Sequence, residues 1–109
     1  MMRKTVFAKK APAAVGPYVH AVETEQLVFT SGQLGLDPET GVLADGIEAQ
    51  THQALKNLGA VLQAVGLGYT DVVRTMVFLD NMDDFATVNS IYAEYFVGEA
   101  PARSCVEVA

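Results

Sequence analysis

Residues 72–79 read VVRTMVFL, and this run sets the architecture of the 109-residue chain. In a β-strand, successive side chains point to opposite faces. Both faces of the run are mainly apolar: one carries Val73, Val77 and Leu79, and the other carries Val72, Met76 and Phe78. Because a strand with two apolar faces is covered on both sides, we predict a central strand between two layers.

Upstream of this strand, the sequence predicts three short strands. They are expected at residues 3–8, 18–23 and 27–31, where apolar and β-branched residues recur. Residues 24–26 are a tight connection that makes the second and third strands a hairpin. Residues 37–41, DPETG, carry strong turn chemistry, because proline fixes φ and glycine accepts a positive φ.

A helix of roughly 20 residues is expected next. Asp45 can cap its first turn, and Glu48, three residues later, completes a pair that resembles a capping box. An apolar stripe at helical spacing follows. Gly66 is expected to end the helix, since glycine adopts the left-handed conformation that terminates many helices.

A second helix is predicted after the central strand, beginning at Asp80 or Asp83 and ending at Gly98. Pro101 then leads into a final strand. Two helices cover only one face of such a sheet, so the other face needs another cover. We predict one α+β domain spanning residues 1–109, with both helices on one face and a second copy of the chain on the other.

Composition restricts the function. Seven Lys and Arg against thirteen Asp and Glu give a net charge of −6, which argues against nucleic acid and anionic membranes as partners. The single cysteine, Cys105, excludes an intrachain disulfide framework and fits a reducing compartment. His20 and His52 show no metal-ligand spacing and are expected to be structural or exposed. No run is long enough to span a membrane, and no signal-peptide core is visible.

The final strand carries an unusual arginine near its start. Side chains alternate along it, with Arg103, Cys105 and Glu107 on one face and Ser104, Val106 and Val108 on the other. Since the two valines are apolar, we expect their face to meet the helices, which leaves Arg103 and Cys105 on the oligomer side. A guanidinium there suits a bidentate carboxylate partner, either a structural Asp or Glu or a small-molecule acid.

Other polar residues are weaker candidates for a site. They are Tyr18, Ser31, Asn89 and Cys105. Each has an ordinary explanation. Tyr18 can be a packed aromatic side chain, and Ser31 can form a turn hydrogen bond. Asn89 can bond a loop to its helix, and Cys105 can be a small core residue. No arrangement of Ser, His and Asp and no phosphate-binding glycine motif is evident.

Together, however, several short motifs form a recognisable pattern. They are Gly16-Pro17-Tyr18, Ser31-Gly32-Gln33, Gln50-Thr51 with Asn57-Leu58, Asp83-Asp84-Phe85 with Val88-Asn89, and Pro101-Ala102-Arg103. In order and spacing, this pattern resembles the reactive intermediate deaminase family (RidA, formerly YjgF) along essentially the whole chain. The resemblance implies a chorismate-mutase-like α+β fold, assembled as a homotrimer with clefts between subunits.

The implied activity is the hydrolysis of reactive enamine and imine acids, chiefly 2-aminoacrylate, to 2-keto acids and ammonia, without metal or cofactor. Arg103 would grip the substrate carboxylate, and Tyr18 is its expected catalytic partner. Ser31, Gly32, Asn89 and Cys105 would line the cleft. The resemblance places such a protein in the cytoplasm, although a mitochondrial location is compatible with it.

Two departures from the family pattern stand out. His20 occupies a position where glutamine is common, which would either retune the mouth of the cleft or have no effect. The family also continues into a further strand whose glutamate positions water; Glu107 is not that residue, because it shares a strand with Arg103. We expect that strand to follow Ala109 in a longer chain. A protein that lacked it would fit a second hypothesis, a non-catalytic or regulatory binder of small carboxylates; the acidic charge disfavours a third, a ribonuclease.

Overall fold

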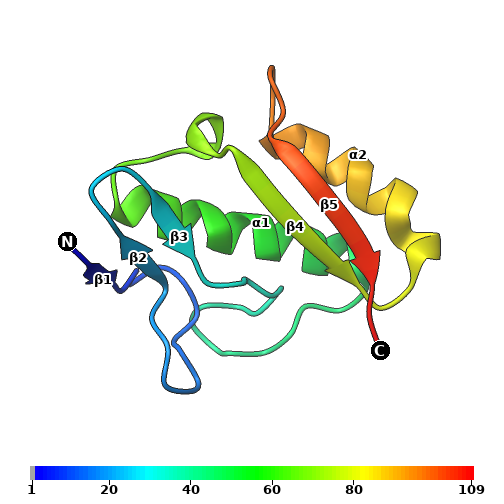
Figure 1. Ribbon diagram of the computed structural model, residues 1–109. Helices are drawn as coiled ribbons and strands as arrows, with labels where there is room; N and C mark the ends of the chain where they lie inside the picture. Colours follow the sequence, from blue (N-terminus) through cyan, green and yellow to red (C-terminus); the bar gives the residue numbers. More distant parts are fainter. Residues whose placement is uncertain (1) are drawn as a thin grey trace.

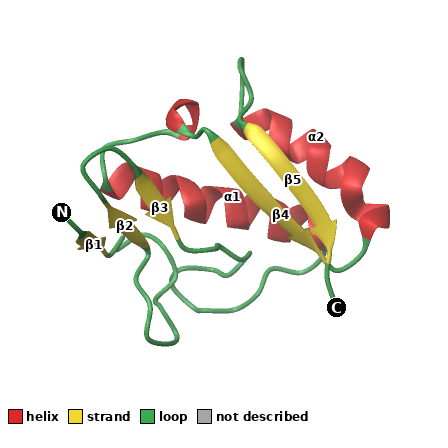
Figure 2. Ribbon diagram, in the orientation of Figure 1, coloured by secondary structure: helices red, strands yellow, loops and turns green. Residues whose placement is uncertain are grey.

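A computed structural model describes residues 2–109, and its order of strands and helices is the predicted one (Figures 1 and 2). The main elements are β1 (Lys4–Val6), β2 (Ala21–Glu23), β3 (Val28–Thr30), α1 (Ile47–Ala64), β4 (Arg74–Leu79), α2 (Phe85–Tyr95) and β5 (Ala102–Glu107). Short 3-10 turns at Tyr69–Asp71 and Met82–Asp84 precede β4 and α2.

The strands form two separate sheets. β1, β2 and β3 are antiparallel neighbours in that order, whereas β4 and β5 pair in parallel. A parallel pair needs a crossover connection, and α2 supplies it. Both helices lie behind the strands in Figure 1, so the predicted α+β architecture with helices on one face is confirmed.

The turns follow the predicted chemistry. The backbone N–H of Thr24 donates to the carbonyl of Leu27 at 2.8 Å and closes the β2–β3 hairpin. Asp37 Oδ1 accepts the N–H of Glu39 at 2.8 Å, which fixes the turn before α1. Gly66 adopts a φ of 75° just after α1, so the predicted helix end is confirmed.

Both helix starts differ from the prediction. Gly46 is the N-cap of α1, with a φ of 85° and no side-chain cap, so Asp45 is not the cap because it lies one residue too early. At the second helix, Asn81 Oδ1 accepts the N–H of Asp83 at 2.9 Å. This bond caps the short 3-10 turn, and α2 begins after that turn, not at Asp80 or Asp83.

The three-stranded sheet is anchored on α1. Val61 of α1 is fully buried and belongs to a cluster with Val6 of β1 and Ala21 of β2. Ala8 and Ala11, in the loop after β1, complete the cluster. The loop that leads toward Tyr18 is therefore packed directly against the long helix.

The two faces of β5 are the reverse of the prediction. Arg103 bonds to α2, so it and Cys105 lie on the helix side, whereas Val106 and Val108 are 41% and 44% exposed. The apolar residues mark an open sheet face here, because aromatic and amide groups of α2 take the helix side. In β4, Phe78 is 60% exposed on the same open face. Its burial by a second copy stays a prediction.

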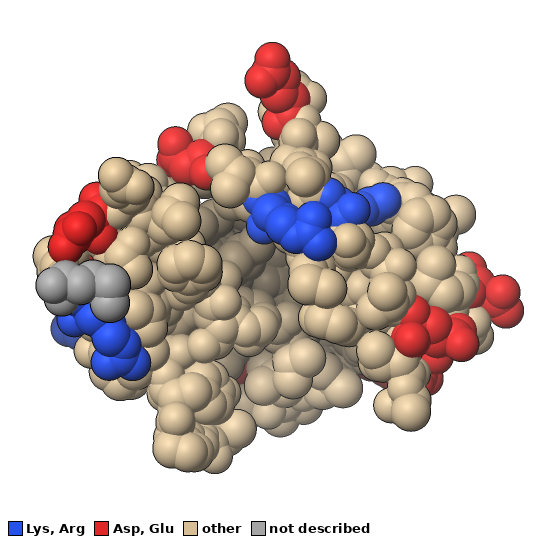
Figure 3. All heavy atoms as spheres, in the orientation of Figure 1, with Lys and Arg blue, Asp and Glu red and all other residues tan. Residues whose placement is uncertain are grey.

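Each sheet also has an unpaired inner edge. Among residues 2–109, β3 pairs only with β2, and β4 pairs only with β5. The space-filling view shows a hollow between the two sheets (Figure 3). None of the helices in this part of the chain is long and apolar enough to cross a membrane.

Candidate active site

Arg103 extends from the start of β5 over α2. Its Nη1 donates to Asn89 Oδ1 at 2.7 Å. The guanidinium carbon lies 4.9 Å from the centre of the Tyr92 ring and 5.5 Å from the centre of the Phe85 ring. The three α2 residues are spaced four and three apart, so they share one helix face. This face of α2 forms a cradle for the guanidinium.

The cradle is braced by the neighbouring strand. In the parallel register Thr75 lies directly beside Arg103, and its Oγ1 is 2.7 Å from Tyr92 Oη. This hydrogen bond orients the ring beneath the guanidinium. A partly desolvated cation–π contact contributes about 0.5–2 kcal/mol, and a hydrogen bond to a charged group about 1.5–3 kcal/mol. Together these contacts offset the loss of water around Arg103.

The positive charge of Arg103 has no carboxylate as its hydrogen-bond partner among residues 2–109. Its partner there is an amide. A guanidinium carries five N–H donors in a planar fork, and one bond to Asn89 leaves donors for a second partner. In Figure 3, positive charge gathers near the start of β4 and β5, beside the hollow. The arrangement is suited to hold a small carboxylate.

Tyr18, Ser31 and Gly32 form a second group. Ser31 Oγ donates to the carbonyl of Val19 at 2.5 Å, so its lone pairs remain available as acceptors. Tyr18 is 45% exposed, and its Oη accepts a long hydrogen bond, 3.4 Å, from the N–H of Val15. Its hydroxyl proton is not used by that bond. Gly32 is exposed, and no atom would contact an added Cβ there within 4 Å.

The two groups do not meet within one chain. Ser31 directly follows β3, and Arg103 lies at the start of β5; in Figure 1 the end of β3 and the start of β5 lie well apart. The structure therefore brings Arg103 together with Asn89 and, two residues along the same strand face, the half-buried thiol of Cys105. It leaves Tyr18 with Ser31 elsewhere.

Apart from Asn89, the residues that hold Arg103 are not recognised from the sequence. None of Phe85, Tyr92 and Thr75 is among the residues that the sequence predicts for the site. A usable signal existed, because both aromatic residues share a helix face with Asn89. The parallel pairing that places Thr75 beside Arg103 has no comparable local signal.

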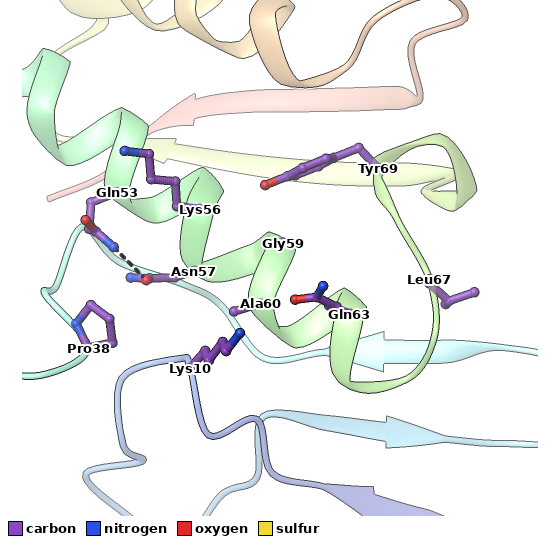
Figure 4. Close-up of a pocket in the computed structure, with 10 residues that line it drawn as sticks. All are labelled: Lys10, Pro38, Gln53, Lys56, Asn57, Gly59, Ala60, Gln63, Leu67 and Tyr69. Atoms are coloured by element: carbon purple, nitrogen blue, oxygen red, sulfur yellow. Dashed lines mark hydrogen bonds between the residues drawn. The ribbon is translucent and has the colours of Figure 1, made fainter.

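A pocket of about 530 Å³ lies elsewhere, along α1 and the segment that follows it (Figure 4). Lys10, Gln53, Lys56 and Tyr69 are among its lining residues, and none of the predicted site residues lines it. Burial raises the pKa of the Tyr69 phenol, and the nearby Tyr95 raises it further. The described part of the chain, residues 2–109, holds no group of three His, Cys, Asp or Glu residues that could bind a metal ion.

Comparison with known proteins places this geometry in context. The model of the Endoribonuclease L-PSP family matches residues 8–109. A 2-iminobutanoate/2-iminopropanoate deaminase from Salmonella typhimurium is 48% identical over 111 residues, covering 99% of this chain and 87% of the relative. The mouse protein of the same name is also 48% identical, covering 100% and 82%.

Solved structures agree with the fold. A putative endoribonuclease from Thermotoga maritima superposes with a TM-score of 0.94 at 46% identity, covering 98% of this chain and 85% of that one. Escherichia coli TdcF with bound serine gives a TM-score of 0.93 at 38% identity, covering 96% and 85%. The match along nearly the whole sequence confirms the predicted resemblance: the chain belongs to the Endoribonuclease L-PSP family, that of the RidA and YjgF proteins.

Proposed function

We propose that the protein hydrolyses reactive 2-imino and 2-enamino acids, such as 2-aminoacrylate, to 2-keto acids and ammonia. The observation that carries the proposal is Arg103, a guanidinium whose hydrogen-bond partner among residues 2–109 is an amide and whose charge is open to a substrate carboxylate. The names of relatives that are 48% identical, both 2-iminobutanoate/2-iminopropanoate deaminases, support the same reaction.

The reaction mainly requires that the substrate be held in the right position. The enamine takes a proton at its terminal carbon and becomes the imine; water then adds to the imine carbon, and the carbinolamine loses ammonia. Arg103 holds the carboxylate next to the reacting carbon, and fixing this geometry lowers the entropic part of the barrier. The Tyr18 hydroxyl is suited to transfer a proton if it is brought to the same substrate.

We further propose that the site is completed across subunits of a homotrimer. Arg103 and Tyr18 belong to groups that lie apart in one chain, so a neighbouring copy would have to supply one of them. The open sheet face supports such an assembly, because Phe78, Met76 and Val106 are 60%, 54% and 41% exposed there, and exposed apolar patches of this kind mark interaction sites.

As part of the same proposal, the two sheets would be joined into one chorismate-mutase-like sheet by a further strand in the hollow between them. The unpaired edges of β3 and β4 support that arrangement. The family's water-positioning glutamate would come from that strand. Glu107 has another task, since its Oε1 accepts the N–H of Met82 at 2.8 Å before α2.

The reaction can be tested by generating 2-aminoacrylate in situ from serine with a dehydratase and following pyruvate release. The wild type should raise the rate above buffer, and Arg103→Ala should abolish that gain. Arg3→Ala is the matched control, because Arg3 is an exposed arginine before β1. Equal rates for wild type, Arg103→Ala and buffer would overturn the proposal.

A second candidate is a non-catalytic binder of small carboxylates, which would use the same arginine. The neighbour TdcF, whose structure holds serine, favours this alternative. Calorimetric titration with pyruvate and serine separates the two. Saturable binding that Arg103→Ala removes, without any gain in pyruvate release, would select the binder.

A further inference from the structure

His20 is one of the most completely hydrogen-bonded residues in the chain. Its side chain is only 4% exposed. Its backbone N–H donates to Val6 at 3.1 Å, and its carbonyl accepts the N–H of Ser31 at 2.9 Å. Its ring nitrogens lie 2.8 Å from the N–H of Ala8 and 2.8 Å from the carbonyl of Pro12. One residue therefore links β1, the loop after it and the end of β3.

The partners of the ring define its tautomer. The N–H of Ala8 can only donate, so Nδ1 must accept and carry no proton. The carbonyl of Pro12 can only accept, so Nε2 must carry the proton. The neutral Nε2–H imidazole satisfies both bonds, whereas a second proton on Nδ1 would face the Ala8 donor. Because the ring is buried, it cannot contact the mouth of a cleft directly.

The two ring bonds hold the loop that leads to Tyr18. Ala8 and Pro12 bracket a turn closed by the N–H of Ala11, which donates to the carbonyl of Ala8 at 3.2 Å. The same histidine is two residues beyond Tyr18, and its backbone carbonyl accepts the N–H of Ser31. Two members of the second site group are therefore tied to His20: Tyr18 through the loop that the imidazole holds, and Ser31 through the backbone carbonyl.

We propose that His20 is a positioning residue for Tyr18 and Ser31, acting through the loop of residues 8–17 and the end of β3. The proposal rests on the proposed function for its catalytic consequence. It does not involve Arg103, which is held by α2. Loss of the imidazole should therefore lower kcat much more than it weakens carboxylate binding.

Three variants at position 20 test the two hydrogen bonds of the ring separately. His20→Ala removes both side-chain bonds. In His20→Asn, the amide oxygen reaches the place of Nδ1 and can accept from Ala8. In His20→Gln, the amide nitrogen reaches the place of Nε2 and can donate to Pro12. The matched control is His52→Ala, because the part-buried His52 bonds Tyr95 Oη at 2.8 Å across the two helices, away from Tyr18 and Ser31.

Two measurements read out the result: steady-state kinetics of pyruvate release, and NMR of the Ala8 amide exchange and the Tyr18 ring signals. His20→Ala should lower kcat about tenfold or more through misplacement of the site, with KM changed less than threefold. The Asn and Gln variants should each recover part of the loss. His52→Ala should lower the melting temperature while kcat stays at the wild-type value.

A folded His20→Ala protein with wild-type kcat would overturn the proposal, and so would a loss that the control shares. If His20→Ala fails to fold, the Asn and Gln variants decide by the same criteria. If the wild type has no activity, the proposed function fails on its own, and NMR decides the present proposal. Faster Ala8 exchange with shifted Tyr18 signals would then support it, and unchanged Tyr18 signals would overturn it.

Discussion

Replacing Asn89 by aspartate should separate stability from activity. The Asn89 Oδ1 atom already accepts from Arg103 at 2.7 Å, so the substitution puts a carboxylate where the amide oxygen lies. The guanidinium would then gain an internal counterion in nearly unchanged geometry. The protein keeps its fold, but the charge that the substrate needs is neutralised.

The magnitude follows from that contact. A hydrogen bond between a substrate carboxylate and a charged donor is worth about 1.5–3 kcal/mol, and most of it is lost once the arginine is paired. Since each 1.4 kcal/mol is tenfold, this corresponds to roughly a 10- to 100-fold loss in kcat/KM. Repulsion between the new carboxylate and the substrate adds to the loss. The free energy of unfolding should rise by about 0–1 kcal/mol, as for a modest ion pair.

The assay pairs pyruvate release from in-situ 2-aminoacrylate with thermal unfolding. Asn89→Ala is the companion variant: it removes the hydrogen bond to the charged guanidinium and should lower the free energy of unfolding by about 1.5–3 kcal/mol. The two substitutions thus have opposite signs in stability and the same sign in activity. An Asn89→Asp protein with kcat/KM within threefold of wild type would refute the role given to Arg103.

Three further outcomes are expected. Gly35→Ala should cost about 1–3 kcal/mol in unfolding free energy, because its Cβ would stand 2.6 Å from a backbone atom of α1; Gly68→Ala, with open space around it, should leave urea midpoints unchanged. The raised pKa of Tyr69 means that folding favours the neutral phenol, so its contribution to stability is complete below about pH 10, the ordinary tyrosine value, and is lost as pH rises further. Tyr69→Phe should flatten that alkaline decline in urea midpoints from pH 8 to 11, and an unchanged slope would contradict it. Phe78→Glu should shift sedimentation toward the single chain and reduce pyruvate release, whereas Val97→Glu, also on an exposed residue, should alter neither.

The element order could be predicted because it depends on local patterns. Alternation marked the strands, a 3.6-residue stripe marked α1, and Gly66 ended it at a positive φ. The start of α1 could not be predicted as well, because Asp45 and Gly46 compete for the cap position. The sequence favours Asp45, because its side chain can accept a hydrogen bond from the first turn. The helix begins one residue later, so Gly46 is the N-cap.

The side on which Arg103 lies depended on tertiary contacts. Hydropathy favoured placing Val106 against the helices, because a buried charge is costly unless it is compensated. The compensation comes from Tyr92 and Asn89, fourteen or fewer residues earlier in sequence but on another element. This contact depends on how α2 packs beside β5, which no local sequence feature specifies.

The unpaired edge of β4 also has a consequence for handling the protein. Residues 75–79, TMVFL, combine high β-propensity with no charge, proline or glycine, the composition of segments that stack into cross-β aggregates. Among residues 2–109 one side of this strand has no partner, and such edges pair readily with other chains. During refolding, docking of β4 in its sheet therefore competes with stacking between molecules. Since stacking is second order in chain concentration, the recovered yield should fall as refolding is carried out at higher concentration.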